Sequence, residues 1–82
     1  MGEAIRCRPH RELTTRLLRT LVSGRWLTER DIILRDRLFL GMYVDLLLFH
    51  QQEEGRIERR EGPVGKPEFR LTPAGVLRLA DG

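Results

Sequence analysis

Apolar residues near the start of the chain recur with the spacing of a helix. The stripe, at i, i+4, i+5, i+8 and i+9, is formed by Leu13, Leu17, Leu18, Leu21 and Val22. This pattern predicts a first helix from His10 that ends at Ser23-Gly24, because glycine readily adopts the left-handed conformation just past a helix. We expect residues 1–9, which contain Arg6 and Arg8, to form a flexible basic arm.

A second helix is predicted at about residues 29–36. Thr28 supplies a capping hydroxyl and Asp31 follows three residues later, which is the pattern of a capping box. This helix would bury Ile32 and Ile33. Before it, residues 25–27 form a short extended link, in which Trp26 is expected to pack at the edge of the core; ligand stacking is the alternative role.

A third helix is predicted after a turn at residues 36–38. It would begin at Phe39 or Gly41, run to Glu54 and be closed by Gly55. The inward positions would be Val44, Leu47, Leu48 and Gln51. The opposite face is also largely apolar, and a helix that is apolar nearly all round needs burial on two sides. We therefore expect part of this face to contact something beyond the chain's own core.

The segment from residue 55 to residue 75 has the pattern of a hairpin followed by a helix start. Apolar residues alternate with polar ones in two short runs, and a breaker-rich turn at residues 62–67 separates them. Thr72 then offers a hydroxyl cap and Pro73 a first helical residue. A short last helix is predicted to follow, up to Ala80.

Length and composition indicate one globular domain. The 82 residues are 40% hydrophobic and 33% charged, and no apolar run approaches a membrane span or a signal peptide. A single cysteine, Cys7, and two histidines, His10 and His50, offer no internal disulfide and no zinc site, so we expect a cytoplasmic protein without a cofactor. With no catalytic triad and no phosphate-binding glycine loop, we predict no enzymatic activity.

Almost all of the basic residues are arginine. Of the 15 basic residues 14 are arginine, and the net charge is +3. The planar guanidinium suits phosphate and guanine edges, so this composition is compatible with nucleic-acid binding. A GC-rich genome would produce the same bias, and both explanations remain open.

The order of these elements resembles the winged helix-turn-helix domain, most closely bacterial regulators of the MarR and PadR type. The resemblance rests on Leu17-Leu18, Trp26-Leu27-Thr28, Gly55-Arg-Ile57 and Phe69-Arg-Leu-Thr-Pro-Ala-Gly75. It implies an α+β, mainly helical fold over residues 10–82, with a three-helix core, a two- or three-stranded wing at about residues 56–71 and a short C-terminal helix. It also implies a transcriptional regulator that binds double-stranded DNA as a homodimer.

Two features depart from the family pattern. Gln51 occupies an inward position where the family usually has leucine, and the third helix has no arginine or lysine between Gly41 and Gly55. Candidate DNA-binding residues are therefore few on that helix and more frequent on the wing. They are Arg37, Tyr43, Gln52, Arg59, Arg60, Lys66 and Arg70.

Each set of candidates has an alternative interpretation. The basic wing residues face Glu58, Glu61 and Glu68, which would pair with them across the hairpin. The third helix would serve instead as a protein-interaction face through Met42, Leu46 and Phe49. The protein would then be a winged-helix interaction module with another protein as its partner.

Overall fold

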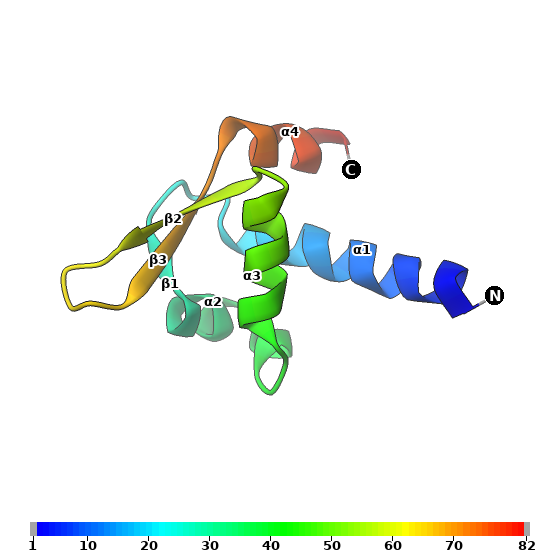
Figure 1. Cartoon of the computed structure of the whole chain (residues 1–82), viewed down its shortest axis with the longest axis horizontal. Helices are drawn as coiled ribbons and strands as arrows, with labels where there is room; N and C mark the ends of the chain where they lie inside the picture. The colour runs from blue at the N-terminus through cyan, green and yellow to red at the C-terminus, as the bar shows by residue number, and fades with distance from the viewer. Residues whose placement is uncertain (1, 82) are drawn as a thin grey trace.

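The structure, a computed structural model, describes residues 2–81, with side chains from Arg11 onward. Within this range the chain has an α+β fold (Figure 1). Its elements are α1 (Gly2–Thr20), β1 (Leu27–Thr28), α2 (Glu29–Arg35), the 3-10 helix η1 (Arg37–Phe39), α3 (Val44–Glu53), β2 (Ile57–Glu61), β3 (Pro67–Leu71) and α4 (Pro73–Asp81).

The three strands form one antiparallel sheet in the order β1-β3-β2. The predicted hairpin is present, with Ile57 opposite Leu71 and Glu61 opposite Pro67. The extended link before α2 supplies the third strand, in which Leu27 lies opposite Phe69. Alternation along the hairpin buries Ile57, Phe69 and Leu71 on one face. The other face carries the charged residues Glu58, Arg60, Glu68 and Arg70.

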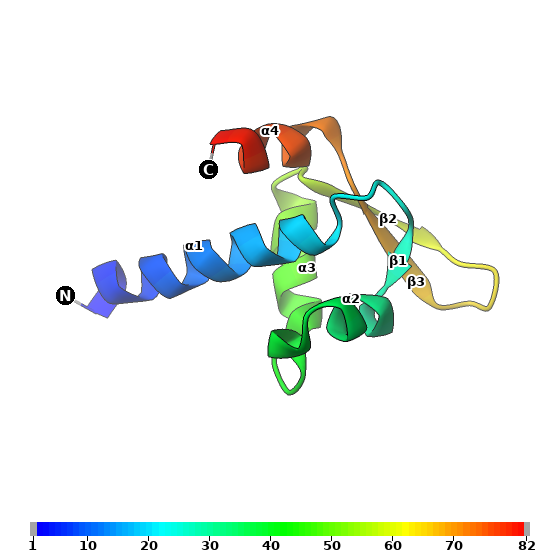
Figure 2. The same cartoon turned by 180° about the vertical axis from the view of Figure 1, so that it is seen from behind.

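The apolar core lies between the helices and the inner face of the sheet. Its fully buried side chains are Leu17, Leu18, Leu21, Ile32, Phe39, Val44 and Leu48. Helix α3 crosses α1, and the hairpin turn points away from the N-terminal end of α1 (Figures 1 and 2). Val22 was expected in the core but is exposed, because α1 ends at Thr20 and Val22 lies in the turn that follows. Ile33, also expected to be buried, is only partly so.

Helix α1 begins at Gly2 rather than at His10, so the arm expected over residues 1–9 is helical from residue 2. Pro9 is the eighth residue of this helix, where its ring fits the helical φ but removes one backbone donor and crowds the carbonyl four residues earlier. The first turns of α1 extend away from the rest of the molecule in both views (Figures 1 and 2). The side chains of Cys7 and His10 lie outside the described residues.

Helix α3 begins at Val44, later than the predicted start at Phe39 or Gly41. The chain forms η1 instead, then turns at Gly41, whose φ of 83° is favourable only for glycine. The predicted turn needs no glycine or proline at its start because the Asp36 carboxylate accepts a hydrogen bond from the backbone N–H of Leu38. Gly55, with φ of 76°, closes α3 as predicted.

The helix caps around Thr28 and Thr72 are confirmed. The Thr28 hydroxyl accepts from the N–H of Asp31 at 3.1 Å, and the Asp31 carboxylate accepts from the N–H of Thr28 at 3.0 Å. Helix α2 ends at Arg35, one residue earlier than expected. The Thr72 hydroxyl accepts from the N–H of Gly75 at 3.2 Å, and α4 extends one residue past Ala80.

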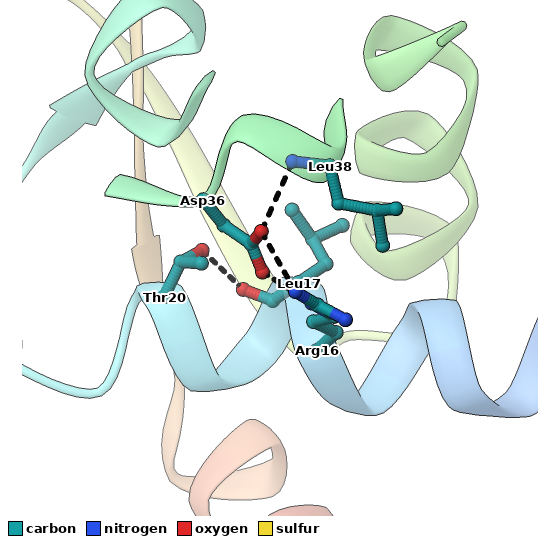
Figure 3. A network of polar contacts seen from close by, with 5 residues as sticks. All are labelled: Arg16, Leu17, Thr20, Asp36 and Leu38. Carbon is teal, nitrogen blue, oxygen red and sulfur yellow. Dashed lines mark hydrogen bonds and ion pairs between the residues drawn. The ribbon is translucent and has the colours of Figure 1, made fainter. Parts of the chain in front are cut away.

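Asp36 also joins α1 to the end of α2 (Figure 3). Its carboxylate accepts hydrogen bonds from both Nε and Nη2 of Arg16, the second at 3.1 Å. The hydrogen bond from Arg16 holds the pKa of the Asp36 carboxyl below its ordinary value, and the bond from Leu38 acts in the same direction, while partial burial opposes it. The stabilisation is therefore present above the unfolded pKa of about 3.9 and is lost as pH falls through the lower folded value.

Asp36→Asn is accordingly expected to lower the melting temperature at pH 7, because asparagine keeps the acceptor for Leu38 but loses the charge. The difference from the unchanged protein should narrow as pH falls below about 4. Thermal unfolding followed by circular dichroism over a pH series measures this difference in melting temperature. Asp36→Ala is the comparison variant and should cost about 1 kcal/mol more, since the cap is also lost. If the difference in melting temperature between Asp36→Asn and the unchanged protein stays constant with pH, the charge of Asp36 contributes nothing to stability.

Candidate functional site

The outer face of the hairpin holds two arginines that already have partners. Arg60 Nε donates to Glu68 at 2.9 Å, and Arg70 donates to Glu58 through Nε at 3.1 Å and Nη2 at 3.0 Å. Both guanidinium groups also lie over the ring of Trp26, at 4.4 Å and 4.5 Å from its centroid. Ion pairing and cation–π attraction thus act together on each arginine.

These contacts match the alternative predicted for Arg60 and Arg70, which was pairing across the hairpin. Arg59 differs, since its contact at 3.8 Å is with Glu61 on the same strand, not with a residue across the sheet. Trp26, expected at the edge of the core, is half-buried, and its ring lies under the guanidinium groups of Arg60 and Arg70. Arg60 and Arg70 are therefore less free to contact DNA than an unpaired cation would be, although exposed ion pairs of this kind are weak.

A groove of about 740 Å³ lies between α2, η1 and the turn of the hairpin. Its apolar lining comes from Ile33, Leu34, Leu40, Val64 and Pro67. Arg30, Arg37 and Lys66 also line it, and none of the three makes an ion pair within the described part of the chain. Unpaired cations around an apolar floor make this groove suited to an anionic ligand. A second groove, of about 820 Å³, is also basic, since Arg11, Arg16, Arg19 and Arg35 line it together with Glu12 and Asp36.

Local geometry explains how the three cations reach the groove. Arg37 is the first residue of η1, which the Asp36 carboxylate caps. Lys66 lies in the hairpin turn, where the N–H of Gly62 donates to its carbonyl at 2.8 Å. Arg30 lies in the first turn of α2, and the capping box sets the direction of that helix. Two acids share the groove, Glu29 and Asp31, of which Asp31 is engaged in the capping box.

The structure brings together only part of the predicted DNA-binding set. Arg37 and Lys66 meet in the groove, whereas Tyr43 and Gln52 do not line it. Arg30 was not among the predicted residues. The sequence held one signal for it: Arg30 lies two residues before the buried Ile32, which places it on the opposite side of the helix.

The exposed face of α3 carries apolar side chains instead of cations. Tyr43 is 78% exposed, and Leu46 and Phe49 are each 54% exposed. Met42 lies beside them and is exposed to a smaller extent, and no arginine or lysine occurs in α3. The ring of His50 meets that of Phe49 edge-on, with centroids 6.2 Å apart. The residues proposed for a protein interface are therefore accessible, Leu46 and Phe49 on α3 and Met42 just before it.

Gln51, predicted to be an inward residue of the third helix, is buried, and both ends of its amide are hydrogen-bonded. Its Nε2 donates to the Thr14 hydroxyl at 3.5 Å, and its Oε1 accepts from Arg56 Nη1 at 3.0 Å. Burying an amide is tolerated when its polar atoms are hydrogen-bonded. The departure at this position is thus accommodated in the fold, where it links α1, α3 and the start of β2.

Metal centres and membrane spans each have a recognisable structural signature. In the part of the chain whose side chains are described, no three histidine, cysteine or acidic side chains gather as metal ligands would. None of the helices within residues 2–81 combines the length and apolar character needed to cross a membrane. Comparison of the whole chain with protein families, with curated proteins and with solved structures found no match.

Proposed function

We propose that the chain is a small winged-helix DNA-binding protein that acts in transcriptional regulation. It contacts the backbone of double-stranded DNA through the groove between α2, η1 and the wing, the β2–β3 hairpin. The observation that carries this proposal is the convergence of the unpaired cations Arg30, Arg37 and Lys66 on that groove. Side chains that hold no internal partner lose little when they approach a phosphate, and each contact releases counterions from the DNA.

Some of the basic residues are paired within the chain and others are not, and this difference favours the groove over the rest of the wing as the DNA contact. Arg60 and Arg70 hold the hairpin through Glu68, Glu58 and Trp26, so their role in the proposal is to position the turn that carries Lys66. Helix α3 offers few groups that read base edges. Contacts to the phosphate backbone should therefore contribute most of the affinity.

Changing Arg30, Arg37 and Lys66 together to alanine is expected to weaken binding to duplex DNA at least tenfold at about 0.1 M salt. The slope of log K against log salt should become shallower by about 0.9 for each phosphate that the protein no longer neutralises. Fluorescence anisotropy of a labelled duplex of about 25 base pairs, over a salt series, measures both quantities.

The matched control changes Arg11, Arg19 and Arg25 to alanine. These residues are exposed, make no ion pair among the described residues and lie outside the groove between α2, η1 and the wing; Arg11 and Arg19 line the second groove instead. Each triple variant removes three positive charges from a net charge of +3, leaving zero, so a difference between them reports position and not total charge. Equal losses of affinity in the two variants, or no DNA binding by the unchanged protein, would contradict the proposal.

A further inference from the structure

The exposed face of α3 carries a short apolar stripe that no described residue covers. Leu46 and Phe49 lie three residues apart on one side of the helix, and Glu53 continues the same line. Met42 is also exposed and lies in the segment just before the helix. Tyr43, 78% exposed, borders the stripe at its N-terminal end. The opposite side of the helix packs into the core through Val44, Leu47 and Leu48. These exposed apolar residues therefore do not contribute to the core of this chain.

The charges along this face are of one sign. Asp45 and Glu53 are exposed on α3, and the helix has no arginine or lysine. The chain as a whole carries a net charge of +3. The charges that α3 carries beside the stripe are therefore negative, although the protein as a whole is positive. A ligand attracted by the charges of α3 would be basic, whereas a ligand attracted by the net charge would be acidic.

We propose that the apolar face of α3 docks an amphipathic basic helix of another protein. Its apolar side would cover Met42, Leu46 and Phe49, and flanking lysines or arginines would lie beside Asp45 and Glu53. From Leu46 to Glu53 this face spans about two helical turns, a length that suits a short partner helix laid along it. A second copy of α3 packed against the first would place acid opposite acid, which disfavours self-association through this face.

The test uses two synthetic peptides of about 18 residues with the same leucine stripe. One carries lysine at its polar positions and the other carries glutamate. The unchanged protein is expected to bind the lysine peptide more tightly than the glutamate peptide, by at least tenfold, as measured by anisotropy of the labelled peptides. Attraction to the whole molecule would give the reverse order, because the net charge is positive.

Variants then locate the binding surface. Leu46→Gln with Phe49→Gln should weaken lysine-peptide binding at least tenfold. The matched control, Val76→Gln with Leu77→Gln, replaces two similarly exposed apolar residues of α4 and should leave binding unchanged. A second pair, Asp45→Lys with Glu53→Lys, keeps the apolar stripe and should reverse the preference between the two peptides. Because this pair removes no apolar side chain, it tests the proposal even if the first pair impairs folding.

Three outcomes would overturn the proposal. The first is equal or tighter binding of the glutamate peptide, and the second is a loss of binding in the α4 control as large as in the α3 variant. The third is self-association of the unchanged protein in sedimentation that the α3 variant abolishes, which would make a second copy the occupant. DNA binding through the groove is measured separately, so either proposal can fail without the other.

Discussion

Replacing Phe39 with alanine is expected to lower the free energy of unfolding by about 3–5 kcal/mol. Phe39 ends the 3-10 helix η1 and is fully buried in the core. Truncation removes the buried ring and leaves a cavity that the short segment between α2 and α3 cannot easily fill. The same change should loosen η1, which carries Arg37 to the groove, so weaker DNA binding is expected as a secondary effect.

Urea unfolding followed by circular dichroism measures the change in stability caused by Phe39→Ala. Leu38→Ala is the matched control, because Leu38 is the adjacent residue of the same 3-10 helix and is 43% exposed. Its truncation should cost well under half as much, since less of its surface is buried in the fold. Similar midpoints for the two variants would show that Phe39 is not the residue that anchors η1.

Replacing Gly75 with alanine is expected to destabilise the fold by about 2–3 kcal/mol, although glycine to alanine within a helix usually stabilises by up to about 1 kcal/mol. An added Cβ would lie 2.2 Å from the carbonyl oxygen of Arg56, which is a backbone atom. That carbonyl also accepts the N–H of Thr72 at 3.0 Å. It cannot move aside without breaking the hydrogen bond that joins the segment before β2 to the start of α4.

Chemical denaturation of Gly75→Ala gives the sign of the effect directly. Ala74→Gly is the comparison variant, because residue 74 is exposed on the same helix, and its cost should not exceed the propensity difference of about 1 kcal/mol. Stabilisation by Gly75→Ala would mean that α4 can move away from Arg56. In that case position 75 would not need glycine to avoid a clash with the Arg56 carbonyl.

The predicted elements that were confirmed depend on signals within a few residues of each other. The capping box at Thr28 and Asp31, the glycine that closes α3 and the alternation of the hairpin are of this kind. The start of α3 was misplaced because apolar spacing alone does not separate a 3-10 turn from the first turn of an α-helix. The beginning of α1 was misplaced because Pro9 was taken as a boundary.

The candidate site was less predictable than the fold. Arg37 was predicted as a DNA-binding residue at the start of the third helix and Lys66 as one of the wing, but their meeting with Arg30 depends on how the hairpin turn lies against α2. Sequence left open whether Arg60 and Arg70 were available to DNA. The answer depends on the register that sets Glu68 opposite Arg60 and Glu58 opposite Arg70, and on β1, which brings Trp26 beside both.

The sequence by itself determined where helices are capped, where the hairpin turns and that α3 is apolar on two faces, because caps, turns and periodicity are short-range properties of the chain. Only the tertiary structure decided which arginines are paired and which cations remain at the groove. Those outcomes depend on contacts between residues distant in sequence, such as Arg16 with Asp36 and Thr14 with Gln51, which only packing brings together.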